Sequence, residues 1–229
     1  MNVEKVGPVG AEITGIDLSI GNNIPTDKII EAFLKHSVLI FKNQDLDPIS
    51  LSKIALIWGQ PLIHPVFKGI EGHPEIIQIQ NLGEKYHTNA HWHSDVTFER
   101  EPPDATLLYS LEIPDEGGDT LFSNQYLAYE GLDESLREEL ENRTAIHSNL
   151  GVLILAGGDK EDEKEVEHPV FRTPPASQRK ALYVTEAFVK GIKGLDSIKS
   201  QETLGKLYEH SCDKKYIYRH KWSQGDLVV

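Results

Sequence analysis

The spacing of apolar and polar residues predicts many short strands in this chain. Alternating runs rich in β-branched and aromatic residues are typical of half-buried strands, and short continuous apolar runs are typical of buried ones. The segment 89–98, in which Trp92, Val96 and Phe98 stand among polar neighbours, fits the first pattern. The predicted strands are 38–41, 75–80, 89–98, 105–111, 120–123, 181–185 and 216–222.

A smaller number of helices is predicted beside these strands. A helix begins at Thr26, which we expect to be its N-cap residue, and Ile29 and Phe33 belong to its apolar stripe. A second helix is predicted over 48–58, and Gly59 ends it. Surface helices are expected at 134–142 and 201–210, and a mobile charged loop at 157–167. Many strands with a few helices indicate a mixed fold.

Composition narrows the class of protein. The 229 residues suit one domain with a sizeable core, and the formal net charge of −13 argues against nucleic acid or an anionic membrane as a partner. The single cysteine, Cys212, excludes a disulfide framework and fits a reducing compartment. No apolar run is long enough to span a bilayer. We therefore expect a cytoplasmic protein with no membrane partner.

The candidate chemistry lies in the triplet His93-Ser94-Asp95. On a regular strand these two outer side chains point to the same side, so an imidazole and a carboxylate could reach one metal ion. That is two-thirds of the 2-His-1-carboxylate set that holds non-heme Fe(II) with positions left open. The triplet alone is a weak signal, because an aspartate–histidine hydrogen bond on a surface strand explains it equally well.

Further motifs accompany this triplet in a fixed order along most of the chain. They include Trp-His-x-Asp-Val-Thr-Phe, a proline pair, and a Gly-Gly-Asp-Thr turn that leads into the strand 120–123. Together they resemble the TauD/TfdA family of Fe(II)- and 2-oxoglutarate-dependent dioxygenases, whose best-known member oxidises taurine. The matching segments are 10–13, 15–18, 92–98, 102–103, 108–120, 128–132, 168–172 and 180–184.

The resemblance implies a fold and a set of roles. The fold is a double-stranded β-helix (jelly-roll), mostly β with surrounding α-helices, and it suits the predicted elements. His93 and Asp95 would be metal ligands, and Thr120 would donate its hydroxyl to a carboxylate of 2-oxoglutarate. Asn89 and His64 match positions near the substrate. From the residues alone, the simpler interpretation is favoured, in which Thr120 is an ordinary strand residue and His64 a turn-capping histidine.

The other histidines of this region receive lesser roles. His91 would share a face with His93 on a regular strand, but the family has a non-ligand there, so we expect a rim or supporting role. His87 is expected in a loop. In the family the second histidine ligand and the arginines that bind 2-oxoglutarate and the substrate lie near the C-terminus. His210 and His220 do not align with that ligand.

The sequence ends at Val229, within an apolar segment that we predict to be an unpaired strand end. We therefore expect residues 1–229 to form one dioxygenase domain that lacks the family's C-terminal segment, with the third ligand beyond Val229. Two alternatives stay open. One is a catalytically inactive jelly-roll relative that binds metal weakly or acts through protein contacts. The other is a hydrolytic zinc site built from His87, His91 and His93.

The resemblance also suggests the class of substrate. Family members use O2 and small organic anions such as sulfonates, sulfate esters and carboxylates, and they commonly form dimers or tetramers. Phe67 stands where the taurine enzyme has a tyrosine, which removes a polar contact and argues against taurine itself. We expect a small, anionic organic substrate, with succinate and carbon dioxide as co-products.

Overall fold

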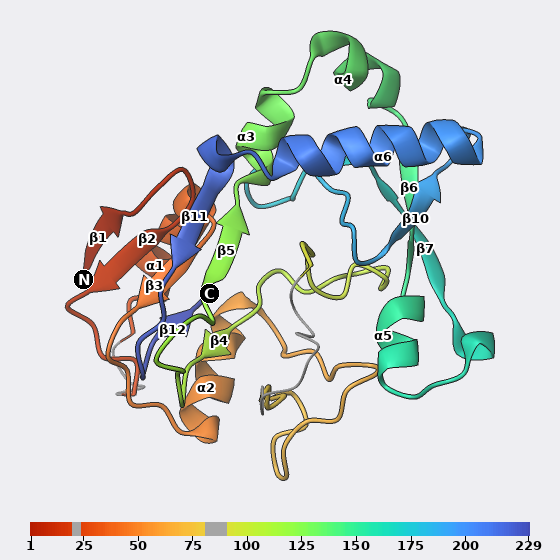
Figure 1. Ribbon diagram of the computed structural model, residues 1–229. Coiled ribbons are helices and arrows are strands. Elements are labelled where there is room, and N and C mark those ends of the chain that lie inside the picture. The colour runs from red at the N-terminus through yellow and green to blue at the C-terminus, as the bar shows by residue number, and fades with distance from the viewer. Residues whose placement is uncertain (20–23, 81–90) are drawn as a thin grey trace.

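A computed structural model describes residues 1–19, 24–80 and 91–229 (Figure 1). Its largest sheet has five strands, and its central strands come from opposite ends of the chain. All neighbours in it are antiparallel except β2 and β3, which are parallel. The strands, in spatial order, are β1 (Asn2–Lys5), β2 (Ala11–Thr14), β3 (Leu39–Phe41), β12 (Leu227–Val228) and β4 (Leu108–Tyr109).

The last strand is paired on both of its sides. Leu227 lies opposite Phe41 on β3 and opposite Tyr109 on β4. The N–H of Val229 donates to the carbonyl of Leu39, and the N–H of Leu39 donates back, both over 2.9 Å. The prediction of an unpaired strand end at Val229 is therefore wrong. These apolar residues are buried because they form the middle of the sheet.

Three smaller sheets complete the β-structure. A three-stranded sheet has the order β10 (Val189–Ile192), β6 (Thr144–Ser148), β7 (Glu165–Pro169). Strand β5 (Thr120–Ser123) pairs with β11 (Ile217–His220), and β8 (Phe171–Arg172) pairs with β9 (Ala181–Leu182). Each of these pairings is antiparallel. The chain thus consists of small sheets with helices around them, in agreement with the predicted mixed fold.

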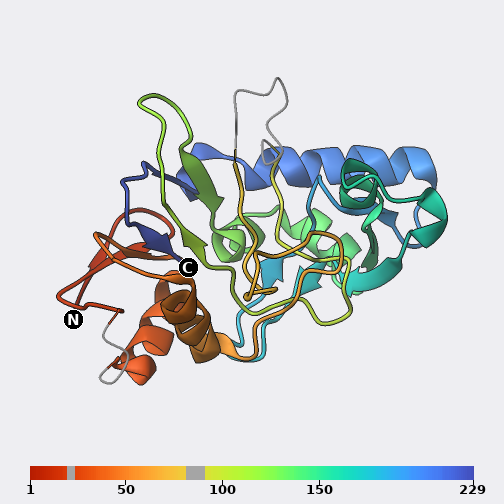
Figure 2. The same ribbon diagram turned by 90° about the horizontal axis from the view of Figure 1, so that it is seen from below.

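Helices cover the outside of these sheets. The longest, α6, runs along one side of the molecule, packed against β10 and α3 (Figure 1 and Figure 2). Among the described residues, no helix is both long enough and apolar enough to cross a membrane. The helices are α1 (Thr26–His36), α2 (Pro48–Ala55), η1 (Leu56–Trp58), α3 (Gln125–Glu130), α4 (Glu134–Leu140), α5 (Leu150–Leu155), η2 (Lys160–Asp162), α6 (Ser197–Ser211) and η3 (Lys214–Tyr216).

Several predicted elements differ in the structure. Thr26 is the first residue of α1 rather than its cap, because Pro25 occupies the N-cap position and makes no side-chain cap bond. The segment 75–80 is not a strand, and only Leu108–Tyr109 of 105–111 is one. The segment 157–167 contains η2 and the start of β7 rather than a plain loop. For the strands, the presence or absence of a pairing partner decided the outcome, and local sequence does not specify it.

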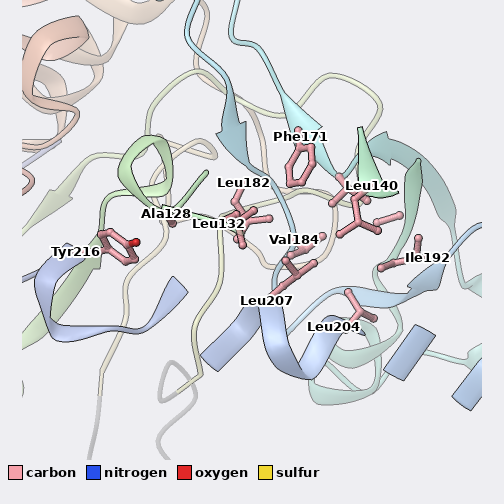
Figure 3. Packing of buried hydrophobic residues seen from close by; sticks show 12 residues of the cluster. Ala128, Leu132, Leu140, Phe171, Leu182, Val184, Ile192, Leu204, Leu207 and Tyr216 are labelled. Atoms are coloured by element: carbon pink, nitrogen blue, oxygen red, sulfur yellow. The ribbon is translucent and has the colours of Figure 1, made fainter. Parts of the chain in front are cut away.

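Two apolar cores hold the molecule together. One fills the space between α3, α4, α6, β6 and β8, where Leu204 and Leu207 of α6 lie beside Val184 and Ile192 (Figure 3). The other packs α1 and α2 against the five-stranded sheet around Phe41. A small separate cluster joins Val96, Phe98 and Phe188. This third cluster anchors the segment that carries His93 and Asp95.

Candidate active site

The segment that carries the His-x-Asp triplet is a turn where the structure describes it. Residues 91–94 are irregular and 95–98 form a turn, so the predicted strand 89–98 is wrong. The turn is closed by a 3.0 Å hydrogen bond from the N–H of Glu99 to the carbonyl of Val96. Val96 itself has a φ of 54°, in the left-handed region that a β-branched residue rarely adopts. An irregular segment that leads into a turn, and not the alternation of a strand, therefore sets where the two side chains point.

This segment nevertheless brings the two candidate ligands together. Nε2 of His93 lies 3.4 Å from Oδ1 of Asp95. Nδ1 of His93 lies 2.7 Å from the carbonyl oxygen of His91, to which it can only donate. The Nδ1 proton is therefore held away from Asp95, and Nε2 is the nitrogen that faces the carboxylate. Metal-bound histidines are commonly fixed in this way by a carbonyl on the far nitrogen.

Electrostatics in this pair favour the charged forms. The hydrogen bond to Asp95 raises the pKa of His93, although burial opposes it. Burial raises the pKa of Asp95, but the hydrogen bonds from His93 and Thr106 outweigh it and leave that pKa below its usual value. The two side chains are 31% and 42% exposed, so the pair remains open to a ligand from solvent. A cation placed between the two atoms would replace the proton that they share.

The donor set fits two of the three positions of a 2-His-1-carboxylate metal site. One imidazole nitrogen and one carboxylate oxygen face each other, and both are ligands that suit iron. Within 1–19, 24–80 and 91–229, no group of three or more His, Cys, Asp or Glu side chains is placed to hold a metal ion. His91 contributes its carbonyl oxygen to His93 while its own side chain lies at the surface, which suits the expected rim position. His87, needed for the zinc alternative, lies outside the described residues.

His64 lies near this pair and also caps a turn. Its Nδ1 accepts the backbone N–H groups of Val66 (3.1 Å) and Phe67 (3.0 Å). Its ring stands edge-to-face against Phe98, with centroids 6.2 Å apart. Burial lowers the pKa of His64, while the charges of Asp95 and Glu99 oppose the shift. A neutral His64 with an occupied Nδ1 carries its proton on Nε2, as a hydrogen-bond donor.

Thr120 lies on another element, at the start of β5. Its Oγ1 accepts a 2.9 Å hydrogen bond from the indole Nε1 of Trp222, which follows the partner strand β11. Gly117 and Gly118, with φ values of 81° and 72°, form the predicted turn before it. Among the described residues, no hydrogen bond joins Thr120 to His93 or Asp95. Asn89 lies outside the described residues.

Other buried polar residues support the site, and pattern reasoning did not single them out. Nδ1 of His147 lies 2.9 Å from Oγ1 of Thr97, and Nε2 of His168 lies 3.0 Å from the carbonyl oxygen of Glu99. For His168 the sequence offered one signal, its place in the matching segment 168–172. For His147 it offered none. Trp222 could be found only by pairing β11 with β5, because it lies 102 residues from Thr120.

The two histidines near the C-terminus are engaged elsewhere. Nε2 of His210 donates to the carbonyl of Ala128 over 2.8 Å. His220 is buried beside the carboxylate of Asp226, with Nε2 3.2 Å from Oδ2. Neither is given a role as a metal ligand.

Comparisons with known proteins address the family directly. The model of the family described as "Taurine catabolism dioxygenase TauD, TfdA family" matches residues 2–229. The α-ketoglutarate-dependent sulfate ester dioxygenase of Pseudomonas putida is 34% identical, over 97% of this chain and 78% of its own length. The alkylsulfatase of Acinetobacter baylyi is 32% identical, over 97% of this chain and 74% of its own length.

Solved structures agree. The crystal structure of a taurine dioxygenase from Burkholderia xenovorans matches with a TM-score of 0.85 and 31% identity, over 99% of this chain and 78% of that one. AAD-2, crystallised with Mn(II) and N-oxalylglycine, matches with a TM-score of 0.81 and 28% identity, over 100% of this chain and 86% of that one. The chain therefore belongs to the TauD/TfdA family and is a 2-oxoglutarate-dependent dioxygenase.

Proposed function

We propose that residues 1–229 act as one jelly-roll dioxygenase domain in which His93 and Asp95 hold Fe(II). The observation that carries the assignment is the 3.4 Å approach of His93 Nε2 to Asp95 Oδ1. Iron bound there supplies the oxidation chemistry, with O2 and 2-oxoglutarate as co-reactants. AAD-2, the relative solved with Mn(II) and N-oxalylglycine, supports a divalent metal beside an oxoacid-like ligand. No third ligand is assigned among the described residues.

Thr120 is the proposed contact for a carboxylate of 2-oxoglutarate. A hydroxyl can donate one hydrogen bond and accept two. Because the indole N–H of Trp222 already donates to Oγ1, the acceptor side of the hydroxyl is engaged and its proton remains available. Trp222 thus turns Thr120 toward the donor role that an anionic ligand requires.

His64 is the proposed contact for the substrate, together with Asn89. The two backbone N–H groups that point at Nδ1 of His64 leave Nε2 as the protonated nitrogen of the neutral ring. A neutral donor near Asp95 can hold an anionic group without adding a second cation beside the metal. The named activities of the relatives, on sulfate esters, sulfonates and aryloxyacetates, support a small organic anion as substrate.

The test is substrate-dependent succinate formation. Purified protein is incubated with Fe(II), 2-oxoglutarate and O2, and with an alkyl sulfate, an alkyl sulfonate or an aryloxyacetate. We expect one anionic class to stimulate succinate release in the wild type and not in Asp95→Asn. His91→Ala is the matched control, because it removes an exposed ring but keeps the carbonyl that orients His93. Equal succinate from wild type and Asp95→Asn would overturn the assignment.

A further inference from the structure

We propose that His147 and His168 are positioning residues that hold the turn 95–98 in its strained shape and thereby fix the place of Asp95. This inference deepens the proposed function and rests on the assignment of His93 and Asp95 as metal ligands. Neither histidine is placed to touch the metal or a substrate. Their effect passes through Thr97, within the turn, and Glu99, directly after it.

The turn contains a residue that does not favour its own conformation. Val96 has a φ of 54°, and a β-branched side chain makes that region costly. Such a residue persists only where its surroundings over-determine it. Val96 immediately follows Asp95, so its φ helps to set the direction in which the chain leaves the carboxylate. Relaxation of Val96 to a negative φ would rotate the segment that carries both His93 and Asp95, as one unit, relative to Thr97 and Glu99.

His147 holds the middle of the turn. It projects from β6, is fully buried, and places Nδ1 2.9 Å from Oγ1 of Thr97, which is itself fully buried. The hydrogen bond is therefore shielded from water at both ends. Its other nitrogen, Nε2, has no hydrogen-bond partner among the described residues. A buried imidazole with a single hydrogen bond is costly to desolvate, which indicates that its bond to Thr97 has a structural role.

His168 holds the end of the turn. It projects from β7 and places Nε2 3.0 Å from the carbonyl oxygen of Glu99. A carbonyl can only accept, so His168 carries its proton on Nε2. In the β6–β7 pairing Ala145 lies opposite His168 and His147 lies opposite Val166, so the two histidines are diagonal neighbours on one face of the sheet.

Aromatic contacts fix both rings. The imidazoles of His147 and His168 meet at 90° with centroids 5.0 Å apart. Tyr183 stacks on His147 at 5.7 Å and stands edge-on to His168 at 5.5 Å. The guanidinium of Arg172 covers the Tyr183 ring at 4.9 Å. With so little freedom in the rings, the turn receives two hydrogen bonds from a rigid frame.

The role predicts a specific pattern of losses. Removal of groups that orient a metal's ligands typically costs about 10–100-fold in metal affinity. Thr97→Val and His168→Leu remove one bond each, and we expect each to weaken Mn(II) binding about 10-fold or more. Thr97→Ser and His168→Gln keep a hydroxyl and an amide N–H at the same places, so we expect affinities near that of the wild type. The chain offers a matched control in His210→Leu, which removes a histidine–carbonyl bond remote from the turn.

Two measurements separate positioning from general destabilisation. Mn(II) affinity is determined by calorimetry on each variant, and hydrogen exchange of the Glu99 amide, which closes the turn, is followed in the metal-free protein. Support is weaker binding and faster exchange in Thr97→Val and His168→Leu, with recovery in the conservative variants. Wild-type affinity and exchange in those two variants, or equal losses in His210→Leu, would overturn the inference. If the wild type bound no Mn(II), the proposed function would fail, and the exchange pattern alone would decide the inference.

Discussion

Nε2 of His93 lies 3.4 Å from Oδ1 of Asp95, although no strand aligns the two residues. The carbonyl of His91 orients the imidazole, while the turn 95–98, with the left-handed φ of Val96, places the segment that carries both residues relative to the buried Thr97 and Phe98. Two side chains that are both partly exposed would not hold this geometry by themselves. The buried residues just beyond Asp95 anchor the turn that begins at it.

Strain at Val96 predicts that a glycine substitution is less destabilising there than an alanine substitution. Val96→Ala and Val96→Gly both remove the buried isopropyl group, but only glycine adopts a φ of 54° without cost. We expect Val96→Gly to be more stable than Val96→Ala by about 1 kcal/mol, because an L-residue pays about that much in the left-handed region. Urea unfolding of both variants measures the difference. An alanine variant as stable as the glycine variant would show that Val96 is not strained.

Removal of the indole N–H from Trp222 should weaken 2-oxoglutarate binding. Trp222→Phe leaves Oγ1 of Thr120 without its donor, so the hydroxyl can turn and lose its orientation. One hydrogen bond is worth about 1 kcal/mol, so we expect an approximately 5-fold higher dissociation constant for 2-oxoglutarate. Trp58→Phe is the control, because Trp58 Nε1 is buried without a hydrogen-bond partner among the described residues. Equal dissociation constants for Trp222→Phe and wild type would remove Trp222 from the account.

Acid should destabilise the fold partly through His147. Burial, with a smaller effect of His168, lowers the pKa of His147 to about 4, whereas an unfolded histidine titrates near 6.5. The folded pKa is the lower one, so the unfolded chain binds the proton first. The stabilising effect is therefore complete above about pH 6.5 and is lost as the pH falls toward 4. The difference corresponds to up to about 3 kcal/mol.

The measurement is the free energy of unfolding in urea at pH 7.5 and at pH 5.0. We expect the wild type to lose about 2 kcal/mol through this group, and His147→Leu to lose correspondingly less. His168 and Tyr183 face His147, and Arg172 covers Tyr183. Burial also lowers the pKa of His168. Protonation of His168 therefore adds a further loss of stability in acid, and this loss remains in His147→Leu. An unchanged pH dependence in His147→Leu would contradict the assignment.

Two lysine–carboxylate pairs should differ sharply in their contribution to stability. Nζ of Lys42 lies 2.6 Å from Oδ2 of Asp226, whose side chain is fully buried, so Lys42→Met removes the lysine cation and leaves the carboxylate with only His220 and the Ser223 N–H beside it. Removal of one partner of a buried pair typically costs about 3–5 kcal/mol. Lys193 pairs with Glu167 at 2.6 Å, but these side chains are 62% and 43% exposed, so Lys193→Met should cost less than about 1 kcal/mol. Equal losses in urea unfolding would contradict this.

The elements that glycine turns delimit were predicted correctly from the sequence. Gly59, with a φ of 125°, ends the helical segment as expected, and the strand after the Gly117-Gly118 turn forms over Thr120–Ser123 as predicted. The juxtaposition of His93 and Asp95 was also predicted, but for the wrong reason. A strand was assumed, whereas an irregular segment that leads into a turn carries the two residues. No sequence pattern predicts a valine with a positive φ.

The support of the site could not be predicted from the sequence alone. His147 meets Thr97 across 50 residues, and His168 meets Glu99 across 69 residues. Such contacts depend on how β6 and β7 pack against the turn. Tertiary packing of this kind produces no periodic pattern in the sequence. The roles of Thr120, His64 and Asn89 stay predictions, and Asn89 lies outside the described residues.

The most direct test of the central claim is an anaerobic titration of the 229-residue protein with Fe(II) and 2-oxoglutarate, followed by its visible charge-transfer absorption. The account predicts a band that saturates at about one iron per chain and is absent in Asp95→Asn, since the site depends on that carboxylate. His91→Ala should retain the band. Absence of the band in the wild type, or its survival in Asp95→Asn, would contradict the claim that His93 and Asp95 hold the iron.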